Sequence, residues 1–293
     1  MPAARVPLVL DTDPGSDIDD AVALAYLLRQ PRCELLGVTT VSGDVRKRAA
    51  IAELVCAAAG RGDVPVVAGA ERPLLFGPGQ PNVPHYDAVK DRPHRTDYPT
   101  HAAVDFLRRT IRARPGEVTL LTVGPLTNVA LLFALDPEIP SLLKGLVTMG
   151  GVFFPAKFPE WNLNVDPVAA AMVYAARVPG HVSYGLDVTT RCQMPPGEVR
   201  KRFAKPPLDV VLAMAEVWFG HAKTITFHDP LAAAGVFVPD LCTYERGEVT
   251  IDASPDHKQG GLSTFTPSPT GPHAVARTVD ADRFFAEYFA RLG

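Results

Sequence analysis

The stretch of sequence that decides the fold reads Val6-Pro7-Leu8-Val9-Leu10-Asp11-Thr12-Asp13-Pro14-Gly15-Ser16-Asp17-Ile18-Asp19-Asp20. Its first part, 6–10, has the length and the Val and Leu content of a buried strand. Residues 20–30 then carry apolar side chains at helical spacing, which predicts a helix opened by aspartates suited to cap its N-terminus. A buried strand followed directly by a helix is the repeating unit of an α/β sheet.

The same alternation continues along the chain. Short runs rich in Val, Leu and Thr precede or follow longer amphipathic stretches, at 6–10, 35–40, 64–67, 118–123, 146–149 and 182–186. This pattern predicts an α/β fold in which a single domain, residues 1–293, has a mostly parallel central sheet with helices on both faces. Ligands of such sheets bind beyond the carboxyl ends of the strands.

Composition narrows the class of protein. The chain has 293 residues, of which 47% are hydrophobic and 21% charged, and its net charge is only -3. No cluster of Lys and Arg stands out, because Arg46-Lys47-Arg48 fits the outer face of one helix turn. Nucleic acid is therefore not expected as a partner. The N-terminus lacks the pattern of a leader, and no apolar run approaches the ~20 residues that span a bilayer, so we expect a soluble, cytoplasmic protein without a membrane partner.

Two further features concern thiols and loops. The four cysteines lie far apart and lack metal-ligand spacing, so we expect reduced thiols, mostly in the core: Cys33, Cys56, Cys192 and Cys242.

The segments Phe76 to Thr100 and Ser254 to His273 are dense in Pro, Gly, His and Asp. Both are expected to form lids or rim loops, because they have too few apolar residues to make core.

The acidic end of the first strand carries the strongest chemical signal. Five aspartates occur within the ten residues 11–20, and their mutual repulsion costs folding free energy unless a cation neutralises it. A hard divalent ion is the simplest remedy. One alternative is an acidic turn and helix cap at the surface. Another is an aspartyl-phosphate phosphatase that binds magnesium, although Pro14 and Gly15 follow Asp13 where that class has DxDxT or DxDxV.

Three later segments carry polar groups at the ends of strands or the starts of helices. His228-Asp229-Pro230 pairs an imidazole with a carboxylate, with Asp229 suited to cap a helix and Pro230 to its first position. Gly124-Pro125-Leu126-Thr127-Asn128 follows the apolar run 118–123, where a turn can leave a backbone carbonyl free for calcium. Glu160 to Pro167 places polar groups around one aromatic. Taken singly, each is also an ordinary capped helix start or turn.

In combination the four segments resemble the inosine-uridine nucleoside hydrolase family, from the first strand to about Ala233. The matched patterns are DxDPGxDDAxAL at Leu10 to Leu24, LTxGPLTNxAL at Leu121 to Leu131, MGG followed by EFN and DP at Met149 to Pro167, and HDPLA at His228 to Ala232. Their order and spacing also fit. The resemblance implies a Rossmann-like core, a homodimer or homotetramer, and a role in purine and pyrimidine salvage.

The resemblance also implies a site and a reaction, the calcium-dependent hydrolysis of a ribonucleoside to ribose and free base. Calcium would be held by four groups: Asp13, Asp20, the main-chain carbonyl of Val123, and Asp229. Ribose hydroxyls would be bound by Asp19, Glu160 and Asn162. Asp13 would also be the general base, and His228 would protonate the departing base.

The chain departs from the family pattern at two acidic positions. DPGSDIDD is two residues longer than the common DPGxDD, which makes Asp17 a surplus carboxylate that is a further ligand, a supporting group or a surface residue; we favour one of the last two. Asp44 replaces an amide residue that would face the ribose. The base-side candidates are His85 and Trp161, with Tyr86, Phe153 and His221 as further possibilities.

Two alternative functions stay open at this point. A modified nucleoside could be the substrate, or the chain could be a non-catalytic protein of the same fold that binds a nucleoside or ribose. The acid and base positions, His228 and Asp13, argue against the second alternative.

Overall fold

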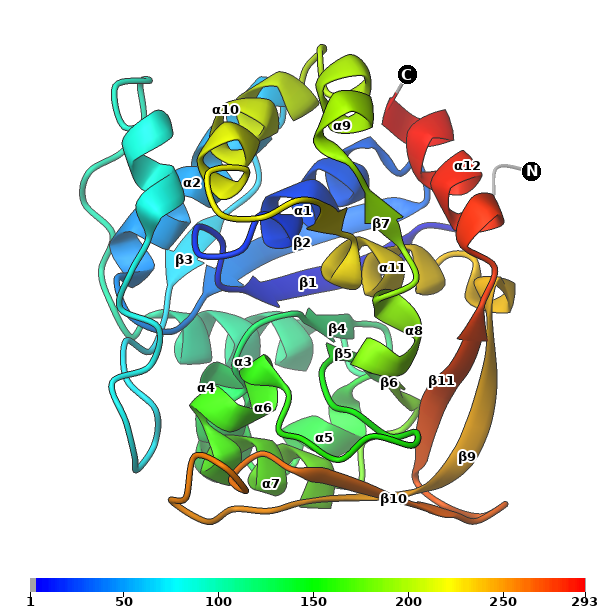
Figure 1. Cartoon of the computed structure of the whole chain (residues 1–293). Coiled ribbons are helices and arrows are strands. Elements are labelled where there is room, and N and C mark those ends of the chain that lie inside the picture. The colour runs from blue at the N-terminus through cyan, green and yellow to red at the C-terminus, as the bar shows by residue number, and fades with distance from the viewer. Residues whose placement is uncertain (1–3, 293) are drawn as a thin grey trace.

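The computed structural model describes residues 4–292, and it is organised around one large twisted sheet (Figure 1). The expected domain, 1–293, includes residues 1–3 and 293, which lie outside the described residues. Nine strands hydrogen bond in the order β10-β9-β11-β6-β5-β4-β1-β2-β3, and a small second sheet pairs β7 with β8. The strands are β1 (Val6–Thr12), β2 (Cys33–Thr40), β3 (Val66–Ala68), β4 (Thr119–Thr122), β5 (Gly145–Met149), β6 (His181–Tyr184), β7 (Gln193–Met194), β8 (Ile225–Thr226), β9 (Cys242–Ile251), β10 (Ser263–Pro267) and β11 (His273–Val279).

Helices cover both faces of this sheet (Figure 1). The α-helices are α1 (Asp19–Arg29), α2 (Val45–Ala58), α3 (Ala103–Ala113), α4 (Thr127–Leu135), α5 (Ile139–Leu142), α6 (Trp161–Val165), α7 (Pro167–Ala175), α8 (Leu186–Thr189), α9 (Pro196–Arg202), α10 (Leu208–Trp218), α11 (His228–Gly235) and α12 (Ala281–Leu292), with short 3₁₀ helices η1 (Pro84–Ala88) and η2 (Pro239–Leu241). One apolar core lies under α1, α2, α10, α11 and α12, and a second under α3, α4 and α7.

The strand order explains where a ligand can enter. From β3 through β6 the order is 3-2-1-4-5-6, and all of these neighbours are parallel. The direction of chain travel across the sheet reverses between β1 and β4, so the connections after these two strands diverge to opposite faces and leave a crevice at their carboxyl ends. Asp13 and Val123 follow β1 and β4 directly.

The predicted fold class is confirmed: the protein has a mostly parallel sheet with helices on both faces, and each of the six predicted strands is present within two residues of its expected start. The four cysteines are buried and free. Within residues 4–292, no helix has the length and apolar character that a membrane span requires.

Four local predictions are wrong. The segment expected to be the second rim loop contains β10, which pairs with β9 because its Ser, Thr and Phe residues suit a half-buried strand. The first expected lid buries Val83, Val89 and Tyr98. Helix α1 has no aspartate side-chain cap at Ile18, since its aspartates serve other partners. Arg48 does not lie on an outer helix face; it is fully buried.

Candidate active site

A pocket opens at the crevice between the carboxyl ends of β1 and β4. Its cavity volume is about 150 Å³, and the cavity is open to solvent on one side. Its lining comes from segments far apart in the chain: Asp13, Ser16, Asp17, Asp19, Asp20, Val123, Met149, Glu160, Trp161, Asn162, Leu186, His228 and Asp229. Nearly all the residues predicted from sequence to form a site are therefore brought together.

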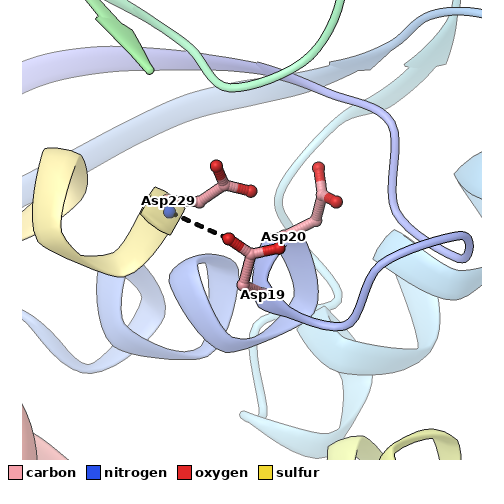
Figure 2. A group of neighbouring side chains, drawn as sticks. All are labelled: Asp19, Asp20 and Asp229. Carbon is pink, nitrogen blue, oxygen red and sulfur yellow. Dashed lines mark hydrogen bonds between the residues drawn. The ribbon is translucent and has the colours of Figure 1, made fainter. Parts of the chain in front are cut away.

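Three buried carboxyl groups converge at the base of the pocket. Asp19 and Asp20 come from the first turn of α1, and Asp229 comes from the first turn of α11 (Figure 2). One carboxylate oxygen from each residue lies within 4.8 Å of the other two, so the group could hold a metal ion. Asp13 also lines this pocket but does not belong to the converging group.

Asp19 joins the two helices that supply the carboxylates. Its Oδ2 atom accepts a hydrogen bond of 3.0 Å from the backbone N–H of Asp229, one of the N–H groups that lack a partner at a helix start. The expectation that Asp229 caps α11 is therefore wrong. The helix begins at His228, Asp19 satisfies the N–H from outside, and the Asp229 carboxylate is left free to face the cluster.

Asp20 is oriented by hydrogen bonds to one of its two oxygens. Oδ1 accepts from the Thr12 hydroxyl at 2.5 Å and from the Asp13 N–H at 3.0 Å, and this leaves Oδ2 without a hydrogen bond among the described residues. Close to the same atoms, Gly124 allows β4 to approach Asp13, since a Cβ on Gly124 would come within 2.7 Å of Asp13 Oδ1. The glycine in the Gly124-to-Asn128 turn is thus required by contact with the acidic segment.

Arg48, which the sequence analysis did not identify, contacts the acidic segment that follows β1. Its guanidinium group lies 3.8 Å from Asp13 Oδ2 and is fully buried. It also donates to the carbonyl oxygens of Asp13, Pro14, Ser42 and Gln80 and to the Ser16 hydroxyl. Helical spacing could have revealed it, because Arg48 lies three residues after Val45 and seven before Val55 on the apolar face of α2.

The electrostatics of the cluster favour a bound cation. Burial, with repulsion between neighbouring carboxylates, raises the pKa of Asp13, Asp19 and Asp229 well above the usual range. Burial also raises the pKa of Asp17 to about 6. A divalent cation would relieve this cost, and the oxygen-only donor set fits a hard ion of the calcium or magnesium class.

Glu160 and Asn162 occupy the side of the pocket that follows β5. Glu160 caps α6 by accepting from the N–H groups of Asn162 and Leu163 at 2.9 and 3.2 Å. The Asn162 side chain donates to the Val123 carbonyl at 2.9 Å. The two groups predicted for ribose and for metal, Asn162 and Val123, are thus in direct contact.

His228 and Trp161 border the pocket near solvent. Trp161 is 55% exposed. His228 is partly buried, and its Nδ1 atom lies 2.7 Å from the Thr189 hydroxyl. Burial lowers the pKa of His228 to about 4, so the imidazole is neutral near pH 7.

The structure places two predicted contact residues outside the pocket. Asp44 instead caps α2, where its side chain accepts from the Lys47 N–H at 3.2 Å. His85 is fully buried beneath Trp218, at 6.3 Å between ring centroids, and does not line the pocket. Asp17, the surplus carboxylate, does line it, while Ile18 anchors the two-residue insertion in the core.

Comparison with known proteins shows which family the chain resembles over most of its length. The family model described as inosine-uridine preferring nucleoside hydrolase matches residues 8–286. Uridine nucleosidase 1 of Arabidopsis thaliana is 34% identical over 272 residues, covering 84% of this chain and 78% of the relative. Non-specific ribonucleoside hydrolase RihC of Salmonella paratyphi C is 31% identical over 310 residues and 98% of each chain. The solved purine-preferring ribonucleoside hydrolase from Gardnerella vaginalis has a TM-score of 0.80 at 25% identity, covering 98% of each chain.

Proposed function

The chain belongs to the inosine-uridine preferring nucleoside hydrolase family, and from that premise we propose that it hydrolyses the N-glycosidic bond of ribonucleosides to ribose and free base. As a member of this family the protein is an enzyme. The observation that carries the proposal is the convergence of Asp19, Asp20 and Asp229 in a pocket that also contains a carboxylate, Asp13, and an imidazole, His228.

Calcium is the ion that we propose for the acidic cluster. Asp13, Asp20, Asp229 and the Val123 carbonyl would supply its oxygen ligands, and the position of Asp19 in the converging group makes it a further candidate. When bound, a calcium ion would lower the pKa of a water ligand and neutralise the carboxylates. The free Oδ2 atom of Asp20 and the unshared Asp229 carboxylate support this assignment.

Asp13 is proposed as the general base that accepts the proton of the attacking water. Its carboxylate lines the pocket, and the guanidinium group of Arg48, which does not line the pocket, lies 3.8 Å from it. The Arg48 charge favours an ionised Asp13, which is the form that accepts a proton. Attack at the anomeric carbon passes through an oxocarbenium-like state, as in glycoside hydrolysis generally.

Ribose is proposed to bind between the acidic cluster and the start of α6, where Glu160 and Asn162 line the pocket. Hydroxyl contacts there would select ribose over deoxyribose, because a missing hydroxyl leaves buried polar groups without partners. His228 is proposed to assist departure of the base from the rim. The homodimer or homotetramer and the cytoplasmic location stay predictions, and light scattering of the purified protein tests the first.

The test is ribose release from a panel of purine and pyrimidine ribonucleosides and their 2′-deoxy counterparts. We expect release from at least one ribonucleoside in calcium, loss of release in chelator, and recovery when calcium is returned. Circular dichroism of the chelated protein separates loss of metal from loss of fold. Absence of release across the whole panel in calcium contradicts the proposed reaction, and full activity of folded protein in chelator contradicts the calcium site.

A further inference from the structure

A hydrogen bond to the Nδ1 atom of His228 indicates a role for Thr189 that the family resemblance did not assign. The Thr189 hydroxyl lies 2.7 Å from Nδ1 of His228. We propose that Thr189 is a positioning residue whose hydroxyl donates to Nδ1 of His228 and so keeps the ring proton on Nε2, the nitrogen left for a ligand in the pocket. The inference rests on the proposed function and deepens it, because it states in which form His228 meets the departing base.

The backbone on both sides holds the two residues in register. Thr189 is the last residue of α8 and is fully buried. Its carbonyl accepts from the Cys192 N–H at 3.0 Å, and the Cys192 carbonyl accepts from the Phe227 N–H at 2.8 Å. Phe227 directly precedes His228, so this chain of bonds connects the end of α8 to the start of α11. The contact between hydroxyl and imidazole is therefore part of a fixed frame.

Hydrogen-bond accounting selects the tautomer. Within residues 4–292, His228 Nδ1 is the one partner of the Thr189 hydroxyl. If Nδ1 carried the ring proton and donated it, the buried hydroxyl hydrogen would have no acceptor, which is an unfavourable arrangement. If the hydroxyl donates to Nδ1, both groups are satisfied and the proton of the neutral ring lies on Nε2.

This tautomer determines what the Nε2 atom of His228 can offer to a ligand. His228 lines the pocket, and within residues 4–292 its side chain hydrogen bonds through Nδ1, to Thr189, and not through Nε2. An Nε2–H can donate to a base nitrogen or carbonyl oxygen that gains electron density as the glycosidic bond breaks. The other tautomer would present a lone pair to the same atom and repel it.

Thr189→Val is the decisive variant because it removes the hydroxyl and keeps the branched shape. We expect kcat for a natural ribonucleoside to fall by about 10- to 100-fold, part of the contribution typical of an acid catalyst. Hydrolysis of p-nitrophenyl riboside should stay within about two-fold, since its phenolate leaves without a donor. Thr189→Ser, which retains the hydroxyl, should restore most of the loss. Thr190→Val is the matched control, because its exposed hydroxyl donates to the Leu186 carbonyl at 2.7 Å.

A second readout needs no substrate. In ¹⁵N-labelled wild type at neutral pH, the His228 imidazole, assigned by comparison with His228→Ala, should carry its proton on Nε2; Thr189→Val should show both tautomers. A proton on Nδ1 in the wild type overturns the inference, as does equal loss of both substrates in Thr189→Val or no loss of either. A wild type that releases no ribose from any nucleoside contradicts the proposed function instead, while the tautomer measurement still decides the role of Thr189.

Discussion

The acidic base of the pocket and its rim are built differently. The base, which we call the acidic floor, consists of Asp13, Asp19, Asp20 and Asp229, all between 3% and 6% exposed. The rim consists of Ser16, Trp161, Leu186 and His228, which are partly buried or exposed.

The difference separates two properties of the site. In the floor, Asp20 accepts hydrogen bonds from the Thr12 hydroxyl and the Asp13 N–H, and Asp19 accepts one from the Asp229 N–H. These bonds preorganise the proposed site for metal and sugar. In the rim, Trp161 and Leu186 come from the short helices α6 and α8, whereas His228 shares α11 with Asp229. We therefore expect the proposed chemistry at the sugar to depend on the buried floor, and the choice of base to depend on the more exposed rim.

Asp13→Ala should have the largest effect, because it removes the proposed base and one proposed metal ligand from the floor. We expect kcat to fall on the order of 10⁴-fold or more, with the circular dichroism spectrum retained. Asp17→Asn is the matched control, since Asp17 also lines the pocket but is not one of the proposed metal ligands. Turnover of Asp13→Ala within a few-fold of wild type would mean that Asp17 takes the role assigned to Asp13.

His228→Ala tests the rim. We expect a loss of about 10²- to 10⁴-fold in kcat for natural ribonucleosides and a much smaller loss for p-nitrophenyl riboside. Calcium affinity, measured by titration calorimetry, should change little because the proposed ligands lie on other side chains. An equal loss for both substrates would show that the residue organises the floor, and the division between floor and rim would then fail at this position.

Arg48→Met tests how much the buried charge of Arg48 stabilises the acidic floor. Removing one partner from a buried ion pair leaves a buried charge uncompensated, so the free energy of unfolding should fall by about 3–5 kcal/mol. Urea unfolding at fixed calcium concentration measures this. Lys47→Met is the control: its partner, Asp44, is exposed, and such surface pairs contribute about 0–1 kcal/mol. Equal small effects for the two variants would argue against any special role for Arg48.

Asp44→Ala should have the smallest effect and tests whether this residue belongs to the site at all. Loss of a helix cap costs about 1 kcal/mol of stability, while KM and kcat for ribonucleosides should stay within about two-fold. A large rise in KM would instead indicate that Asp44 contacts ribose, as expected from the sequence.

The sequence predicted the strands of the N-terminal part of the chain better than those of the C-terminal part. The sequences of β1 to β6 are strongly apolar because these strands are largely buried. Their apolar runs therefore predict strands directly. β9, Cys242–Ile251, alternates buried and exposed residues and contains charged side chains, and β10 contains Ser, Thr and Pro. Such strands resemble loops in composition, and only pairing with β11 and with each other makes them part of the sheet.

The acidic floor could be predicted because its aspartates are adjacent in sequence or lie in motifs that match a family. His85 could not be placed, since titratable side chains in polar loops are expected at the surface, yet its backbone N–H bonds to the Gly15 carbonyl at 3.2 Å and carries the ring into the core. Thr189 could not be found either. Its role depends on distance to His228 across 39 residues, which no local pattern records.

The hydrogen bond from Asp229 to Asp19 joins residues 210 positions apart. During synthesis at about 5–20 residues per second, roughly 10–40 s pass between the addition of these two residues. For that interval the nascent chain carries the acidic N-terminus of α1 without the helix that completes the floor. The β1–α1 segment must therefore stay solvated or be shielded until α11 leaves the ribosome, which makes closure of the floor a late event in the life of each new chain.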